Sequence, residues 1–168
     1  LIQCIAAPSV PLVQTLMASD KVQVILATGG GPMVRAAYSS GNPAIGVGPG
    51  NAPIYIDDSA DPNAAAARIV DSKSFDNSIL CTNESVLLVH ARRHQAFERA
   101  LRASGAHLCS ETEVAQLRAY LFPHGHLNTA AVGKTAVWIA QQAGFRVVGS
   151  VRVLVAPIAT AGIEEPLA

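Results

Sequence analysis

Short apolar runs alternate along this chain with longer segments in which apolar residues recur at helical spacing. The runs that we predict to be strands are residues 1–6, 22–27, 43–47, 53–56, 85–89, 106–108 and 151–155. The segments that we predict to be helices are residues 10–18, 33–39, 61–75, 92–104, 110–121 and 133–143. Because strands and helices alternate throughout, the pattern predicts the α/β class, with a mostly parallel sheet flanked by helices.

Residue types at the ends of these segments support the assignment. Asp61 followed by Pro62 is a typical helix start, and Ser110 with Glu113 forms the sequence pattern of a capping box. Gly144 follows the last predicted helix and is expected to end it. The strand at 85–89 is almost continuously apolar, which predicts that both of its faces are covered.

Composition and charge narrow the possible functions. The chain has 168 residues, half of them hydrophobic, with 12 basic and 12 acidic side chains. This balance gives no electrostatic basis for binding nucleic acid or an anionic membrane. We find no signal peptide and no apolar run long enough to span a bilayer, so we expect a cytoplasmic protein. Both ends of the sequence break off abruptly, which indicates a piece of a longer protein.

The three cysteines, Cys4, Cys81 and Cys109, form no CxxC pair and are expected to be reduced. We interpret Cys4, in a predicted buried strand, and Cys109 as structural. His124 and His126 share a predicted loop, but no acidic or cysteine partner lies near them in the sequence. We therefore predict no metal site.

Cys81 is the strongest candidate for chemistry. It lies in a polar stretch, residues 74–84, between a predicted helix and a predicted strand. A thiol at such a turn can face a cleft, with backbone N–H groups free beside it. A thiolate that attacks a carbonyl and N–H donors for the resulting oxyanion are what a covalent thioester mechanism requires. The alternative is a small buried hydrophobic residue, as most free cysteines are.

A second candidate is the glycine turn at residues 28–31, which follows a predicted strand and precedes a predicted helix. In this context backbone N–H groups and a helix N-terminus can face a phosphate. The turn is neither GxGxxG nor a P-loop, because no Gly-Lys-Ser/Thr follows. The alternative is a tight turn that needs positive φ angles.

Five segments together resemble the coenzyme-A-acylating aldehyde dehydrogenases, including the aldehyde dehydrogenase half of bifunctional aldehyde–alcohol dehydrogenases. They are residues 27–41, 46–51, 74–81, 127–133 and 164–168, in the same order as in that family. The resemblance implies the three-layer aldehyde dehydrogenase fold. It also implies that residues 1–42 are the C-terminal part of a dinucleotide-binding domain and residues 43–168 a truncated catalytic domain.

The resemblance further implies roles for individual residues. Cys81 would attack the aldehyde, and its own N–H would supply half of the oxyanion hole. Thr28, Gly29 and Gly30 match the turn near the cofactor phosphates, and Glu165 matches the glutamate that binds the nicotinamide ribose. The implied cofactor is NAD or NADP, with coenzyme A as co-substrate and a small aldehyde as substrate. The intact enzyme would be a homo-oligomer in the cytoplasm or in a bacterial microcompartment.

One position departs from the hydrolytic aldehyde dehydrogenases. Those enzymes carry a water-activating glutamate where this chain has Val47. Valine cannot act as a general base, so the comparison favours acyl transfer to a thiol over hydrolysis. Two alternatives stay open: a hydrolytic aldehyde dehydrogenase, and a non-catalytic remnant of the fold. The 168-residue piece alone is expected to be inactive.

Overall fold

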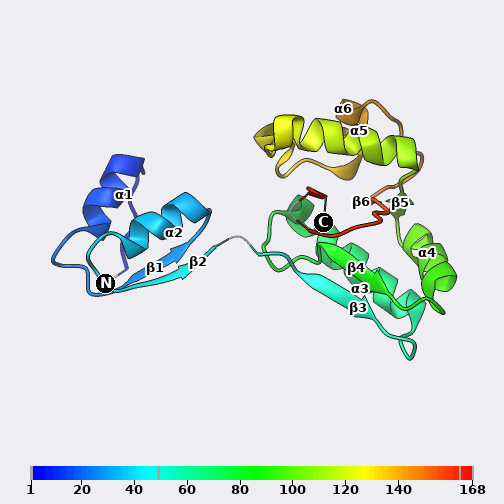
Figure 1. The fold of residues 1–168 in the computed structure, drawn as a ribbon, viewed down its shortest axis with the longest axis horizontal. Helices are drawn as coiled ribbons and strands as arrows, with labels where there is room; N and C mark the ends of the chain where they lie inside the picture. The colour runs from blue at the N-terminus through cyan, green and yellow to red at the C-terminus, as the bar shows by residue number, and fades with distance from the viewer. Residues whose placement is uncertain (1, 49, 163, 168) are drawn as a thin grey trace. The chain divides into compact units, whose positions relative to one another are not determined.

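The computed structural model describes residues 2–48, 50–162 and 164–167 (Figure 1). The chain forms two compact units, Leu1–Gly50 and Asn51–Ala168, each with its own hydrophobic core. In the described ranges, none of the helices has the length and apolar character that crossing a membrane requires.

The first unit is a small βαβ arrangement preceded by a helix. Its elements in order are α1 (Val10–Met17), β1 (Ile25–Thr28), α2 (Gly31–Tyr38) and β2 (Ala44–Val47). β1 and β2 pair in parallel, with Ile25 opposite Ala44 and Thr28 opposite Val47. A parallel pair needs a crossover connection, and α2 supplies it.

Gly46 lets α2 lie close against β2. A methyl group at Gly46 would lie 2.5 Å from Cγ1 of Val34 and 2.8 Å from Cε2 of Tyr38, both on α2. The Gly46 N–H also donates a hydrogen bond of 3.0 Å to the Tyr38 hydroxyl. The helix therefore approaches the strand more closely than any residue with a Cβ atom would permit.

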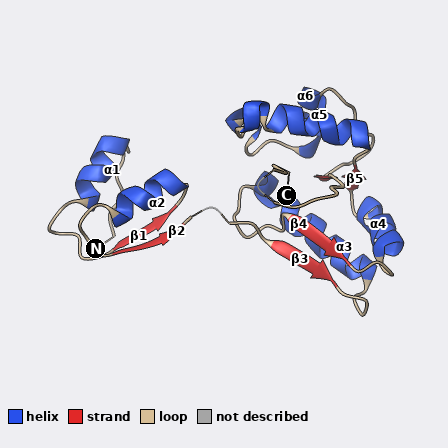
Figure 2. Ribbon diagram, viewed as in Figure 1, coloured by secondary structure: helices blue, strands red, loops and turns tan. Residues whose placement is uncertain are grey.

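The second unit contains two further parallel strand pairs with their crossover helices (Figure 2). Its first part holds β3 (Pro53–Ile56), α3 (Pro62–Ser74), the 3-10 helix η1 (Phe75–Ser78), β4 (Val86–Val89) and α4 (His94–Ala103). Its second part holds β5 (Ala106–Leu108), α5 (Glu111–Leu121), η2 (Pro123–Gly125), η3 (Thr129–Ala131), α6 (Ala136–Ala143) and β6 (Val153–Val155). β3 pairs with β4, and β5 pairs with β6.

Two hydrophobic clusters form the core of this unit. The first joins α3 and α4 to the strands around the fully buried side chains of Val70 and Phe97. The second joins α5 and α6 and includes Cys109, which is buried, in keeping with its interpretation as a structural residue. The predicted α/β class and its parallel pairing are confirmed, although the described residues form separate two-stranded sheets.

The predicted helix ends are confirmed. The Asp61 carboxylate accepts a hydrogen bond of 2.9 Å from the Asn63 N–H at the start of α3. Ser110 and Glu113 form the reciprocal hydrogen bonds of a capping box at α5. Gly144 ends α6 with φ of 96°, the left-handed conformation that glycine adopts without strain.

Two predictions about strands are wrong. Residues 2–6 are exposed and irregular rather than a buried strand, and Cys4 is exposed with them. A strand needs a neighbour for its N–H and C=O groups, and none of the described strands pairs with this segment. β4 is not covered on both faces, since Leu88 and its partner Tyr55 are more than half exposed. The predicted turn at 48–51 includes Pro49, which lies outside the described residues.

We expect Gly46→Ala to destabilise the first unit by about 1–3 kcal/mol, because the new methyl group overlaps two side chains of α2. The free energy of unfolding can be measured by urea denaturation followed by circular dichroism. Gly48→Ala is the matched control, because a methyl group there meets nothing within 4 Å. Equal destabilisation by both substitutions would contradict the proposed close packing.

Candidate active site

Cys81 lies in the turn of residues 80–83, between η1 and β4, and is exposed. Among the hydrogen bonds of the described residues, none is donated by the N–H of Cys81 or of Thr82. An accessible thiol therefore lies beside backbone donors that have no acceptor in the described part of the chain. This is the arrangement that stabilisation of an oxyanion next to a reacting sulfur requires.

Asn83, which the sequence interpretation did not single out, holds this turn in place. Its side chain is almost fully buried, and its Nδ2 donates to the Ser72 carbonyl near the end of α3. Its backbone N–H donates to the Leu80 carbonyl at 3.2 Å. A polar residue two positions before the predicted strand at 85–89 was the available signal in the sequence.

The chain enters the turn through consecutive residues in the left-handed region. Asp76 and Asn77 both have φ of 50°, and Ser78 has φ of 67°. Asp and Asn adopt this conformation more readily than other non-glycine residues. Nδ2 of Asn77 donates a hydrogen bond of 3.0 Å to the carbonyl of Gly133, which helps to hold the conformation.

Gly133 also packs against the side chain of Ile79, the residue that follows these left-handed residues. A Cβ atom at Gly133 would lie 2.9 Å from Cδ1 of Ile79, and Gly133 itself has φ of 72°. Two segments that carried the family resemblance, 74–81 and 127–133, are therefore in contact. The glycine at 133 provides both the backbone conformation and the space that this contact needs.

A cavity of about 580 Å³ in the second unit is lined by residues on both sides of the cysteine turn, but Cys81 is not among them. Lys73 and Glu84 line it; burial lowers the pKa of Lys73, and the negative charge of Glu84 opposes that shift. One carboxylate oxygen of Glu84, Oε2, is buried and has no hydrogen-bond partner among the described residues. Leaving such a group unpaired costs about 1–3 kcal/mol. Glu84 directly follows the turn of residues 80–83, so the turn lies next to a polar part of the cavity wall.

Glu165, predicted to bind the nicotinamide ribose, is held by an arginine of α5. Its Oε2 lies 2.7 Å from Nη2 of Arg118, and its Oε1 lies 3.2 Å from Nε. The Leu167 N–H also donates to Oε1. The hydrogen bonds from Arg118 hold the pKa of Glu165 below its usual value. The carboxylate therefore stays ionised and fixed, a feature that sequence spacing did not indicate.

The glycine turn lies in the first unit. Thr28 ends β1, and Gly30 is the N-terminal cap of α2 with φ of −64°. Neither Gly29 nor Gly30 has a positive φ, so a turn that needs positive φ angles does not explain these glycines. The Gly29 N–H donates to the Val47 carbonyl at 3.1 Å, which joins the turn to the end of β2.

Arg35 adds a positive charge to this turn. Its Nη1 lies 3.2 Å from the position that a Cβ atom of Gly31 would occupy. Among the described residues no side chain caps the start of α2. Pro32 has no N–H and the Met33 N–H donates to the Gly30 carbonyl at 3.0 Å, so the N–H of Gly31 is the donor of this first turn that is left for an anion. Cys81 and Glu165 belong to the second unit, so the predicted site residues are divided between the two units.

The environments of the thiols differ. Cys109 is buried, and burial together with the charge of Glu113 raises the pKa of its thiol to about 12. Cys4 and Cys81 are both exposed. Cys109 is therefore protonated and shielded at neutral pH, and Cys81 is the accessible thiol of the second unit.

An α/β chain with an exposed cysteine at a helix–strand turn and a glycine turn at a strand–helix junction fits a known enzyme family. The family model described as the aldehyde dehydrogenase family matches residues 1–117, and the chain belongs to this family. It is 40% identical over 168 residues to the bifunctional aldehyde-alcohol dehydrogenase of Escherichia coli, covering 100% of the chain and 19% of that protein.

Solved structures agree with this assignment. An acetylating aldehyde dehydrogenase from Geobacillus thermoglucosidasius matches with a TM-score of 0.94 and 40% identity, over 99% of this chain and 37% of that one. The propionaldehyde dehydrogenase of Rhodopseudomonas palustris with bound propionyl-CoA matches with a TM-score of 0.84 and 33% identity, over 95% of this chain and 35% of that one. The expected aldehyde-dehydrogenase-like fold is confirmed. The chain spans about a fifth of the length of the aldehyde-alcohol dehydrogenases that it matches.

We expect limiting iodoacetamide to label Cys81 before the other thiols. Cys109 should react more slowly by on the order of a hundredfold or more, because its thiol is buried and protonated. Cys4 is also exposed and serves as the comparison. Cys81 should be labelled before Cys4 if the N–H groups of the Cys81 turn stabilise the thiolate. Peptide mapping by mass spectrometry measures the order of labelling. In the urea-unfolded protein the three cysteines should be labelled at similar rates. Preferential labelling of Cys109 in the folded protein would count against Cys81 as the nucleophile.

Proposed function

We propose that the chain supplies the nucleophile of a coenzyme-A-acylating aldehyde dehydrogenase, which oxidises a short-chain aldehyde to its acyl-CoA in a reversible reaction. The observation that carries this proposal is the exposed Cys81 thiol beside backbone N–H groups that have no acceptor among the described residues. The similarity to acetylating and propionaldehyde dehydrogenases supports it.

In the proposed reaction the Cys81 thiolate forms a bond to the aldehyde carbon. The carbonyl π electrons move to oxygen, and the Cys81 N–H donates a hydrogen bond to the resulting oxyanion. NAD or NADP, when bound, accepts the hydride that leaves this carbon. Cys81 then holds the acyl group as a thioester, and attack by the coenzyme A thiolate releases Cys81 again.

The glycine turn and Glu165 are proposed to hold the dinucleotide. Thr28, Gly29 and Gly30 would place the N–H of Gly31, the first residue of α2, against its phosphates, and the nearby Arg35 guanidinium adds a favourable charge. Glu165 would accept hydrogen bonds from the ribose hydroxyls. Its ionised state, maintained by Arg118, suits an acceptor.

Val47 distinguishes this proposal from a hydrolytic aldehyde dehydrogenase, the second candidate. Its side chain lies at the end of β2, opposite Thr28, and is 55% exposed. It offers no base that would activate water near the acyl group. The thioester would therefore persist until a thiol arrives, as acyl transfer to coenzyme A requires.

We retain the predicted division into a dinucleotide-binding part, residues 1–42, and a catalytic part, residues 43–168. The compact units divide later, at Gly50, because β2 (Ala44–Val47) pairs with β1 and so belongs to the first unit. The proposed division by function and the division by contacts therefore differ by this one strand. The intact enzyme is proposed to be a homo-oligomer in the cytoplasm or in a microcompartment.

The full-length enzyme should sustain NADH formation from a short-chain aldehyde over many turnovers only when coenzyme A is present. Without coenzyme A, a burst of about one NADH per active site should be followed by a stall, because the acyl-enzyme is not hydrolysed. Cys81→Ala should remove both the burst and turnover, lowering kcat by on the order of a thousandfold or more. Stopped-flow absorbance measures both phases, with Cys4→Ala as the control. Equal rates of free-acid formation with and without coenzyme A would favour the hydrolytic candidate.

Val47→Glu should increase hydrolysis of the acyl-enzyme in the full-length protein. A positioned general base contributes about a hundredfold to ten-thousandfold, so the stall without coenzyme A should give way to steady NADH formation and free acid. Val47→Gln is the control, because it has nearly the same shape and cannot act as a base. If both variants hydrolyse equally fast, the gain comes from water entry and not from general-base catalysis.

A further inference from the structure

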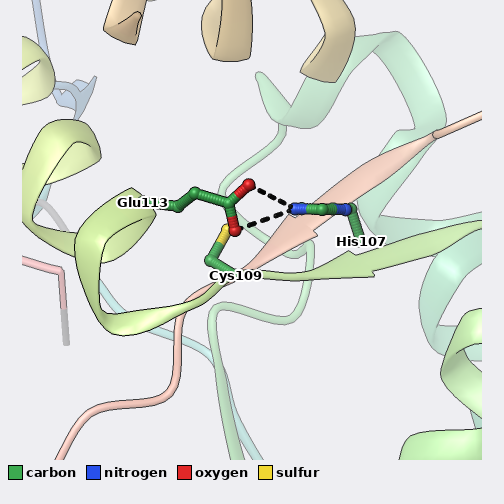
Figure 3. Close-up of side chains that lie close together, drawn as sticks. All are labelled: His107, Cys109 and Glu113. Carbon is green, nitrogen blue, oxygen red and sulfur yellow. Dashed lines mark hydrogen bonds and ion pairs between the residues drawn. The ribbon is translucent and has the colours of Figure 1, made fainter. Parts of the chain in front are cut away.

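His107, Cys109 and Glu113 bring three kinds of metal-ligating atom together at the junction of β5 and α5 (Figure 3). The imidazole nitrogen, the thiol sulfur and a carboxylate oxygen all lie within 4.8 Å of one another. The proposed dehydrogenase reaction uses none of these residues. His124 and His126, the pair considered from the sequence, are not part of this group.

The local fold explains how the three side chains meet. His107 and Cys109 are two residues apart along an extended segment, so their side chains emerge on the same face. The Cys109 N–H donates to the Val155 carbonyl at 2.8 Å, which extends the pairing of β5 with β6 as far as this residue. The strand then passes directly into α5, and Glu113 in the first turn of that helix points back toward both residues.

The capping box fixes the Glu113 carboxylate. Its Oε2 accepts hydrogen bonds from the Ser110 N–H at 2.7 Å and from the Ser110 hydroxyl at 3.1 Å. Nε2 of His107 lies 3.2 Å from Oε1 and 3.1 Å from Oε2, and Oε1 has no other hydrogen-bond partner among the described residues. Oε1 can therefore bind a cation while Oε2 keeps the helix capped.

Burial differs across the group in a way that suits a bound ion. Cys109 is buried in the core cluster of α5 and α6, whereas the side chains of His107 and Glu113 are 23% and 19% exposed. An ion can therefore enter from the side of His107 and Glu113 and meet the thiol at the bottom of the site. The His107 ring is also held by stacking on Phe145.

We propose that His107, Cys109 and Glu113 bind a divalent cation of the zinc class, with water as the fourth ligand. Nitrogen, sulfur and carboxylate oxygen together suit zinc, whereas magnesium and calcium prefer oxygen alone. Zinc ligands lie about 2.0–2.3 Å from the ion, so side-chain rotations that draw the three atoms closer complete the site. The Cys109 S–H bond breaks, its proton goes to solvent, and a sulfur–metal bond forms. In the metal-free protein Nε2 of His107 donates its N–H to the carboxylate. On metal binding this proton goes to solvent, the neutral ring keeps its proton on Nδ1, and the freed lone pair of Nε2 binds the metal.

Cobalt(II) is a suitable probe, because a thiolate ligand gives it a charge-transfer band in the near ultraviolet. The full-length protein, first treated with chelator, should bind cobalt and show a component of this band that is absent from Cys109→Ser. Added zinc should displace the cobalt. Glu113→Gln should weaken cobalt binding at this site by on the order of a hundredfold. Glutamine still serves a capping box, so this variant separates loss of the ligand from loss of the helix cap.

Matched controls use residues of the same types outside the group. Cys81→Ser, Glu111→Gln and His124→Gln should leave the Cys109-dependent band and the affinity unchanged, whereas His107→Gln should weaken binding as Glu113→Gln does. Circular dichroism reports whether each variant is folded. A charge-transfer band that survives in folded Cys109→Ser and disappears in Cys81→Ser would overturn the proposal. So would cobalt affinity that neither Glu113→Gln nor His107→Gln changes.

Discussion

Parallel strand pairing is the constraint on which the rest of this structure depends. Each pair, β1–β2, β3–β4 and β5–β6, needs a crossover connection, and in each of them the crossover contains a helix. Every crossover creates junctions where a helix begins or ends beside a strand, and helix ends leave backbone groups without intrahelical partners. Three of the candidate groups lie at such junctions: the glycine turn after β1, the His107–Glu113 group where β5 leads into α5, and Cys81 before β4.

The Cys81 junction is the most costly of the three. Left-handed residues such as Asp76 and Asn77 cost of order 1–3 kcal/mol each. The hydrogen bond from Asn77 to Gly133 offsets part of that cost. Nδ2 of Asn83 holds the turn against the Ser72 carbonyl, while Oδ1 of the same amide is buried with no hydrogen-bond partner among the described residues. These contacts also orient the turn, so that its N–H groups stay next to the thiol without being used by the fold. Strain and anchoring are together consistent with a turn whose geometry serves a reaction.

The sequence predicted what depends on neighbouring residues and missed what depends on distant ones. Caps such as Asp61 and Ser110 are local, since the side chain bonds to the backbone within three residues, and both were predicted. Residues 1–6 were predicted as a strand from composition alone, although pairing needs a partner elsewhere. The ion pair between Arg118 and Glu165 joins residues 47 positions apart, and no periodic pattern in the sequence indicates that they meet. Similarly, His107 and Glu113 became a group only when the capping box turned the carboxylate back toward the strand.

Cys81 and Cys109 show how the same side chain acquires two chemistries from its surroundings. Cys81 is exposed beside unused N–H donors, an environment that stabilises negative charge on a reacting carbonyl oxygen. Cys109 is buried beside a carboxylate, and both burial and that charge raise the pKa of its thiol. To attack a neutral electrophile, Cys109 would have to ionise, and its thiolate would be desolvated and repelled by Glu113. A neutral electrophile carries no charge that could compensate for these two penalties. A divalent cation offsets both penalties at once, since it is attracted by the carboxylate and binds the sulfur directly. The two thiols are therefore suited to different partners: Cys81 to the carbonyl carbon of an aldehyde, and Cys109 to a metal ion.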